Sequence, residues 1–216
     1  MTLRLAVFDL DGTLKREPDP YVYLHRALGT LEASLAHYQR GIAGELAYGE
    51  WLRLDVALWK GVARARLESL LRANPYLPGA VETVRTLRAA GVHLAVISTG
   101  IHLHAEMVCA ELGIDRWFAN EILFQDGVCS GQAIERLPEG GKGEIVAQIQ
   151  AELGIGPETT LAVGDGTSDV DMFALARVSV AVAPSSARVR QAATIVLETP
   201  DLRALLARVS ETEPGW

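Results

Sequence analysis

Cysteine is scarce in this sequence, and several other features that define large protein classes are missing. Only Cys109 and Cys129 occur in 216 residues, which is too few for a disulfide framework or a cysteine-based zinc site. No apolar run approaches the roughly 18 residues of a membrane-spanning helix. The first residues enter a strand-like segment without the anatomy of a signal peptide. We therefore expect a cytoplasmic protein that contacts no membrane.

An excess of positive charge is also missing. The chain has 20 basic and 27 acidic residues, a net charge of −7, and its basic residues are scattered. This pattern lacks the basic stripe that nucleic-acid binding requires. Hydrophobic residues make up 49% and charged residues 22% of the chain, which is ordinary for a globular protein with a sizeable core.

Short apolar runs alternate with helical patterns along most of the chain. The runs have the character of strands buried on both faces, and they are Leu5–Phe8, Leu94–Ile97, Thr160–Val163, Val178–Val182 and, more weakly, Thr194–Leu197. Helical spacing of apolar residues, each time followed by glycine, occurs at Ala80–Ala90, Ala105–Leu112 and Glu144–Leu153. We predict an α/β fold with a Rossmann-like parallel sheet core, covered by helices on both faces.

One long segment interrupts this alternation. Residues 18 to 76 contain no convincing strand, have the pattern of several helices, and are bounded by prolines. We predict a small helical domain over residues 15–76, inserted after the first strand, and a sheet domain formed by residues 1–14 and 77–216. Asp126-Gly127, between two apolar segments, is a strong signal for a β-hairpin.

Acidic residues follow two of the predicted strands. Asp9 and Asp11 come after the first strand, and Asp165 and Asp169 come after Thr160–Val163. Binding sites of doubly wound sheets form at this carboxyl edge, so we expect the four carboxylates to converge. Carboxylates in a partly dry crevice repel one another unless a cation lies among them. An all-oxygen donor set favours a hard cation such as Mg²⁺.

Four motifs occur in a fixed order: Asp9-Leu-Asp-Gly-Thr13, the strand-ending Ser98, Lys142 before a helix, and Gly164-Asp-Gly-Thr-Ser-Asp169. Together they resemble the motifs of the haloacid dehalogenase superfamily of phosphohydrolases, and the helical insertion looks like the cap of that superfamily. Several strings are most similar to its phosphoserine phosphatase branch: Leu94–Gly100, Phe118–Asn120, the Asp126-Gly127 hairpin and Lys142–Ile145.

The resemblance implies Mg²⁺-dependent hydrolysis of a small phosphorylated metabolite through an aspartyl-phosphate. Asp9 would attack phosphorus, and Asp11 would protonate the leaving oxygen and later activate water. The implied metal site comprises Asp9, the carbonyl of Asp11, Asp165 and, as a residue that orients Lys142 or a metal-bound water, Asp169. The phosphoryl oxygens would be bound by Ser98, the amides of Thr99 and Gly100, and Lys142.

Three positions depart from the phosphoserine phosphatase pattern. Pro18 stands where those enzymes have a glutamate for the substrate amine, and Asp55 aligns with an arginine that pairs with the substrate carboxylate. Ser168 replaces an asparagine near the substrate. Because a buried carboxylate repels another carboxylate, we predict that free phosphoserine is not the specific substrate.

Asp55 shares a predicted helix face with four other residues: Tyr48, Trp51, Leu52 and Trp59. One interpretation is packing, in which the aromatic residues fill the cap and Asp55 pairs with a nearby arginine such as Arg64 or Arg66. The other is a substrate pocket that includes Tyr48 and Asp55. Aromatic walls and one carboxylate would suit an amine or a hydroxyl-rich leaving group.

Two other functions stay open: a phosphotransferase or phosphomutase that uses the same aspartyl-phosphate, and a non-catalytic module that binds a phospho-ligand. Dehalogenation is disfavoured because it has no evident use for Asp11 and Asp165. His102 and His104 have no partners at zinc-ligand spacing, and we expect both to be exposed. The sequence is compatible with a monomer or a homodimer.

Overall fold

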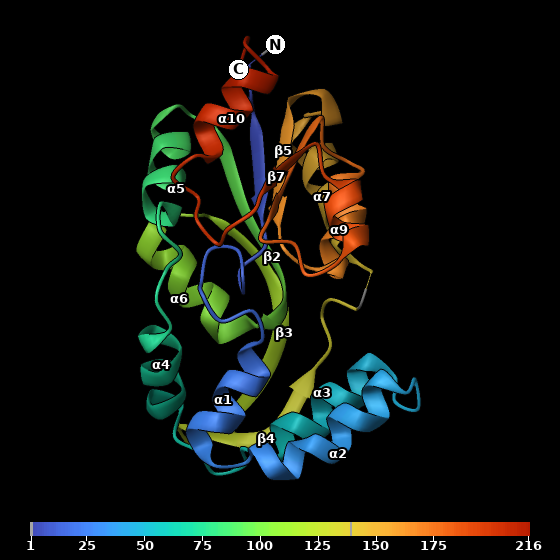
Figure 1. The fold of residues 1–216 in the computed structure, drawn as a ribbon. Helices are drawn as coiled ribbons and strands as arrows, with labels where there is room; N and C mark the ends of the chain where they lie inside the picture. Colours follow the sequence, from blue (N-terminus) through green and yellow to red (C-terminus); the bar gives the residue numbers. More distant parts are fainter. Residues whose placement is uncertain (1, 139) are drawn as a thin grey trace.

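A seven-stranded sheet forms the centre of the computed structural model, which describes residues 2–138 and 140–216 (Figure 1). Its strand order is β4-β3-β2-β1-β5-β6-β7. The strands are β1 Leu5–Phe8, β2 His93–Ile101, β3 Arg116–Gln125, β4 Val128–Ile134, β5 Thr160–Gly164, β6 Val178–Val182 and β7 Ile195–Leu197. All neighbouring pairs are parallel except β3 and β4.

Helices cover both faces of the sheet. One face packs against α5 (Ala80–Ala89), α6 (His102–Leu112) and α10 (Leu205–Thr212), and the other against α7 (Lys142–Leu153), α8 (Val170–Phe173) and α9 (Ala187–Ala192). Side chains of β1 alternate between the two apolar layers, because successive residues of a strand point to opposite faces. Ala6 and Phe8 join the first layer, and Leu5 and Val7 join the second. The predicted α/β fold is confirmed.

The order of the strands places the ends of β1, β2 and β5 at one edge. The chain runs from β1 to β2 and β3 on one side, then returns to β5 on the other side of β1. Phe8 pairs with both Val96 and Val163, so the residues that follow these three positions lie side by side. A reversal of this kind opens a crevice at the carboxyl edge of a sheet.

Four helices follow β1: α1 Pro20–Leu28, α2 Leu31–Ile42, α3 Tyr48–Ala57 and α4 Arg64–Ala73. This confirms the helical character of the insertion. In Figure 1, α2 and α3 lie at the end of the molecule opposite the two termini. Leu24, Trp59 and Leu67 form an apolar cluster with Ile122 and Cys129 of the β3–β4 hairpin. The insertion therefore shares a core with the hairpin, and the division into two domains stays a prediction.

The predicted elements agree with the structure except near the site. The hairpin forms at Asp126-Gly127, where φ is +50° and +77°, as a two-residue turn with two positive φ angles requires. By contrast, β2 continues through Ser98, Thr99 and Gly100 to Ile101, beyond the predicted end at Ile97. The polar residues end the apolar run but not the extended backbone. Within the described residues, no helix has the length and hydrophobicity of a membrane span.

Candidate active site

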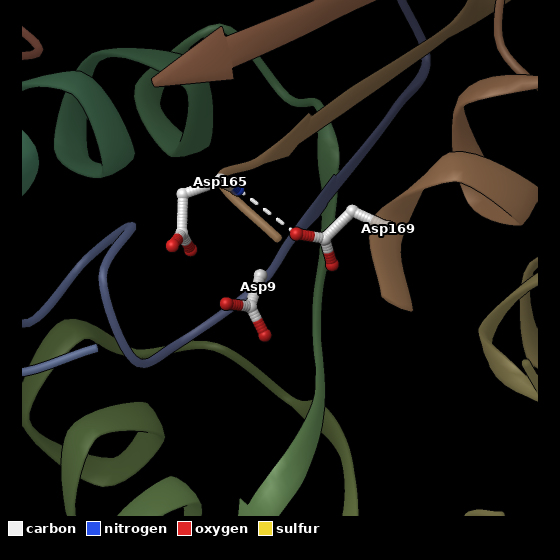
Figure 2. Close-up of side chains that lie close together, drawn as sticks. All are labelled: Asp9, Asp165 and Asp169. Carbon is white, nitrogen blue, oxygen red and sulfur yellow. Dashed lines mark hydrogen bonds between the residues drawn. The ribbon is translucent and has the colours of Figure 1, made fainter. Parts of the chain in front are cut away.

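Three aspartates meet where β1 and β5 end. Asp9 directly follows β1, Asp165 directly follows β5, and Asp169 precedes α8 (Figure 2). Within the described residues, one carboxylate oxygen of each lies within 4.8 Å of the corresponding oxygens of the other two. Three of the four predicted metal-site residues therefore come together through their side chains.

The surroundings of these carboxylates disfavour their charged forms. Burial raises the pKa of Asp9 well above its ordinary value; Lys142 opposes this rise, while Asp169, Asp165 and Asp11 add to it. Burial, with a contribution from Asp169, raises the pKa of Asp165 to about 7, although the Thr13 hydroxyl donates a hydrogen bond of 3.0 Å to it. Such a buried, oxygen-only set fits a hard divalent cation, which would relieve the mutual repulsion.

Lys142 lies at the start of α7 and is fully buried. Its Nζ donates to Oδ1 of Asp9 and Oδ1 of Asp169, each at 2.6 Å. Burial alone would lower the pKa of Lys142, but the charges of Asp169 and Asp9 outweigh it, and the pKa is raised. Lys142 is therefore a fixed positive charge beside Asp9.

Asp169 uses both carboxylate oxygens within the protein. Oδ1 accepts from Lys142, while Oδ2 accepts from the backbone amides of Asp165 (2.9 Å) and Gly166 (2.8 Å). The first of these amide bonds is the dashed line in Figure 2. This geometry suits the orienting of Lys142, one of the two roles that the sequence predicts for Asp169.

The carboxylate of Asp11 lies outside the cluster formed by the other three. Its Oδ2 accepts from Ser98 Oγ at 3.2 Å, and its Oδ1 lies 3.1 Å from His104 Nδ1. The expected convergence of four carboxylates is thus wrong for this side chain, because the Ser98 hydroxyl and His104 hold it toward β2 and α6. Asp11 and Asp9 nevertheless line the same cavity.

The expected exposure of the two histidines is also wrong. Helix α6 begins at His102, three residues before the predicted start, so His104 lies in its first turn and contacts Asp11. His104 is 1% exposed. His102 is half-buried and accepts a hydrogen bond of 3.3 Å from Trp117 Nε1.

A cavity of about 210 Å³ joins the sheet edge to the insertion. Nine of the predicted site residues line it: Asp9, Asp11, Tyr48, Asp55, Ser98, Thr99, Gly100, Asp165 and Ser168. Lys142 and Asp169 are outside this lining and act on it through Asp9 and the Asp165 backbone. A small ester fits such a volume.

Residues 98–100 line this cavity and form close contacts with one another and with Asp11. The Gly100 amide donates to Ser98 Oγ at 2.8 Å, so the predicted donor to a phosphoryl group is engaged by its neighbour here. A Cβ on Gly100 would lie 2.5 Å from Asp11 Oδ2 and 2.9 Å from Ser98 Oγ. Only glycine leaves room for the contact between Ser98 and Asp11.

Tyr48 connects α3 to the same segment. Its hydroxyl donates to the Thr99 carbonyl at 2.5 Å, and Asn120 Nδ2 donates to that carbonyl at 2.8 Å and to the Tyr48 hydroxyl oxygen at 3.2 Å. Burial raises the pKa of Tyr48 to about 12, so the phenol stays protonated and donates.

Asp55 pairs with histidines rather than with an arginine. His37 Nδ1 lies 2.9 Å and His25 Nε2 3.6 Å from Asp55 Oδ1, while Arg64 pairs with Glu68 and Glu106. The predicted arginine partner is therefore wrong. Tyr48, Trp51, Leu52 and Asp55 line the cavity, whereas Trp59 is fully buried outside it.

Five residues of the site are not among the predicted site residues: Thr13, His25, His37, His104 and Asn120. Thr13 and Asn120 lie inside two of the motifs described above, Asp9–Thr13 and Phe118–Asn120. Their place in these motifs was a signal that could have identified them as site residues. The three histidines carry no pattern of their own. Their contacts depend on how α1, α2 and α6 pack.

Comparison with known proteins identifies the class that this fold and site define. The haloacid dehalogenase-like hydrolase family model matches residues 6–174, so the chain belongs to that family. It is an enzyme of the phosphoric monoester hydrolase class.

The relatives narrow this to the phosphoserine phosphatase-like branch. The phosphoserine phosphatase of Methanocaldococcus jannaschii is 32% identical over 204 residues, covering 94% of this chain and 96% of the relative. That of Wolinella succinogenes is 31% identical over 208 residues, covering 96% and 100%. A phospho-aspartyl intermediate analogue of phosphoserine phosphatase superposes with a TM-score of 0.83 at 31% identity, over 96% of this chain and 99% of that one.

Proposed function

We propose that this enzyme hydrolyses a small phosphomonoester in a Mg²⁺-dependent reaction, through an aspartyl-phosphate on Asp9. The observation that carries the proposal is the position of Asp9, whose carboxylate contacts Lys142 at 2.6 Å and lines a cavity shared with Asp11. The relative solved as a phospho-aspartyl intermediate analogue supports the same chemistry.

In the first half-reaction, an Asp9 carboxylate oxygen forms a bond to phosphorus while the bond from phosphorus to the ester oxygen breaks. Asp11 gives its proton to the departing alcohol oxygen. In the second, Asp11 takes a proton from water as the water oxygen attacks phosphorus. The acyl-phosphate bond then breaks, inorganic phosphate leaves and Asp9 is restored.

Asp9, the carbonyl of Asp11 and Asp165 would hold the cation, with Asp169 next to them. Bound Mg²⁺ would withdraw charge from the phosphoryl oxygens. Lys142, oriented by Asp169, neutralises further charge beside Asp9. Ser98 holds Asp11 in the cavity, and Ser98, Thr99, Gly100 and Ser168 are proposed to contact the substrate.

Free phosphoserine is not proposed as the specific substrate. Asp55 faces the part of the cavity formed by the insertion, and a substrate carboxylate placed there would meet its negative charge. Replacing Asp55 with arginine should therefore change the ranking within a panel of phosphate esters, including phosphoserine. An unchanged ranking would exclude Asp55 from substrate recognition.

The central test is turnover of an aryl phosphate, measured as phosphate release. We expect activity with Mg²⁺, loss of activity in excess EDTA and in Asp9→Asn, and one phosphoryl group trapped on the Asp9 peptide. Undiminished activity in EDTA or in Asp9→Asn would refute the mechanism. Product that depends on an added alcohol acceptor, without phosphate release, would indicate phosphotransfer instead.

A further inference from the structure

His25 places an unpaired, buried hydrogen-bond donor beside the cavity. Trp59 Nε1 donates to His25 Nδ1 at 3.0 Å, and Thr30 Oγ1 lies 2.7 Å from the same nitrogen. An indole N–H can only donate, so Nδ1 is the acceptor and the neutral ring carries its hydrogen on Nε2. His25 is 1% exposed, and its Nε2 has no hydrogen-bond partner among the described residues.

Asp55 provides an acceptor beside this donor. His37 Nδ1 donates to Asp55 Oδ1 at 2.9 Å and so fixes the carboxylate. Oδ1 lies 3.6 Å from His25 Nε2, which is too far for a good hydrogen bond between them. One ligand oxygen can contact both atoms once a small shift of the His25 ring opens its buried Nε2 to the cavity. His25 and Asp55 both line the cavity that contains Asp9.

A donor and an acceptor side by side select among the groups that a phosphate ester can carry. An ammonium group only donates, so it would leave the buried Nε2–H unpaired. A carboxylate could accept from His25 but would face Asp55. A hydroxyl donates to Asp55 and accepts from His25 with the same oxygen. Buried polar groups without partners are costly, so the hydroxyl fits best.

We propose that the leaving group is an alcohol with a further hydroxyl, as in polyol and sugar phosphates, and that this hydroxyl bridges His25 Nε2 and Asp55. The inference rests on the proposed phosphatase function. Of the two leaving groups that the cavity's aromatic residues and Asp55 suggest, an amine and a hydroxyl-rich group, the inference selects the hydroxyl-rich group. Tyr21, Tyr38 and Trp51 line the same cavity and supply apolar surface for the carbon chain.

The test uses alkyl phosphates that differ only in their terminal group. Esters with two to four carbons and a terminal hydroxyl, ammonium, methyl or carboxylate group are compared by kcat/KM in the wild-type enzyme. We expect the best hydroxyl ester to exceed every other ester of its length by at least about tenfold, since a missing partner leaves a buried group unpaired. An ammonium or methyl ester that equals it would overturn the proposal.

Variants then assign the preference to the two residues. Asp55→Asn and His25→Phe should each lower the hydroxyl-to-methyl ratio of kcat/KM about tenfold. Glu50→Gln, which neutralises an exposed carboxylate on the same helix, should leave it unchanged. Because the ratio is taken within one protein, partial loss of folding cancels. A ratio preserved in both cavity variants would also overturn the proposal.

An aryl phosphate separates this inference from the proposed function. An enzyme that releases phosphate from the aryl ester but does not favour hydroxyl esters refutes the leaving-group proposal alone. If even the aryl ester is inert, calorimetric binding of the matching hydroxyalkyl, aminoalkyl and alkyl phosphonates still ranks the terminal groups. The same tenfold preference is expected there, and its absence refutes the inference.

Discussion

Replacing Asp169 with asparagine tests whether a buried ion pair positions Lys142. Asn is similar in size but offers one acceptor oxygen in place of two. If that oxygen accepts hydrogen bonds from the amides of Asp165 and Gly166, the Asn side-chain NH₂ group faces Lys142 Nζ, and both groups are donors. If it serves Lys142, the two backbone amides lose their acceptor. Neither orientation satisfies all three donors.

The magnitude follows from the burial of the two groups. Asp169 and Lys142 are both fully buried, and hydrogen bonds to charged groups contribute about 1.5–3 kcal/mol each. Lys142 keeps Asp9 as a partner, and one negative charge beside Asp165 disappears, which offsets part of the loss. We expect Asp169→Asn to lower the free energy of unfolding by about 2 kcal/mol, or the melting temperature by about 4–8 °C for a chain of this size.

The assay is thermal unfolding in EDTA at pH 7.5, where the carboxylates of the unfolded chain are ionised, followed by aryl phosphate turnover with Mg²⁺. Asp171→Asn is the matched control, because within the described residues Asp171 accepts hydrogen bonds only from backbone amides, those of Gly143 (2.8 Å) and Met172 (2.9 Å). It should cost at most about 1 kcal/mol. Asp169→Asn should also lower kcat at least about tenfold.

A double-mutant cycle decides whether the effect passes through Lys142. In the Lys142→Met background the cation is gone, so Asp169→Asn should cost much less than in the wild type. Equal costs in both backgrounds, or a melting temperature of Asp169→Asn no lower than that of Asp171→Asn, would refute the reasoning.

Three further predictions concern the same edge of the sheet. In EDTA the raised pKa values of Asp9 and Asp165 mean that the folded state binds protons more tightly than the unfolded state, so stability falls as pH rises through about 7. The melting temperature should be higher at pH 6 than at pH 8, and Asp165→Asn should reduce the difference; a rise toward pH 8 contradicts this. His104→Leu should lower kcat about tenfold by releasing Asp11, and His104→Asn, which keeps a donor, should lower it less. Equal losses in aryl phosphate turnover would show that the hydrogen bond between His104 and Asp11 does not contribute to kcat. Gly100→Ala should lower kcat at least about tenfold with an unchanged circular dichroism spectrum, because its Cβ would contact Asp11; full activity would show that the segment can shift.

The sheet and the residues at its edge could be predicted from the sequence for a simple reason. Strands such as Leu5–Phe8 and Thr160–Gly164 are buried on both faces, so each appears as an apolar run that ends where the chain reaches the cavity. Asp9 and Asp165 follow directly. Their convergence needs only the parallel order of the strands, which alternation with helices predicts.

The contacts of the histidines could not be predicted from the sequence in this way. His104 is placed by the first turn of α6, and its start depends on how β2 continues past Ile97. Asp55 could be assigned to a helix face, but its partners His25 and His37 come from α1 and α2. Periodicity describes one helix at a time, whereas these contacts arise from the packing of three.

Hydrogen bonds at Thr99 link the leaving-group side of the cavity to the phosphoryl side. The Tyr48 hydroxyl from the insertion and Asn120 from β3 both donate to the Thr99 carbonyl, directly next to Ser98, which holds Asp11. We expect these hydrogen bonds to fix the position of an alcohol bound at His25 and Asp55 relative to Asp11, the proposed proton donor. The residues proposed to act on phosphorus come from the edge of the sheet and from the start of α7, and those proposed to bind the alcohol come from the helical insertion. Substitutions such as Asp55 for arginine can therefore change the leaving group while Asp9, Lys142 and Asp165 keep the same geometry.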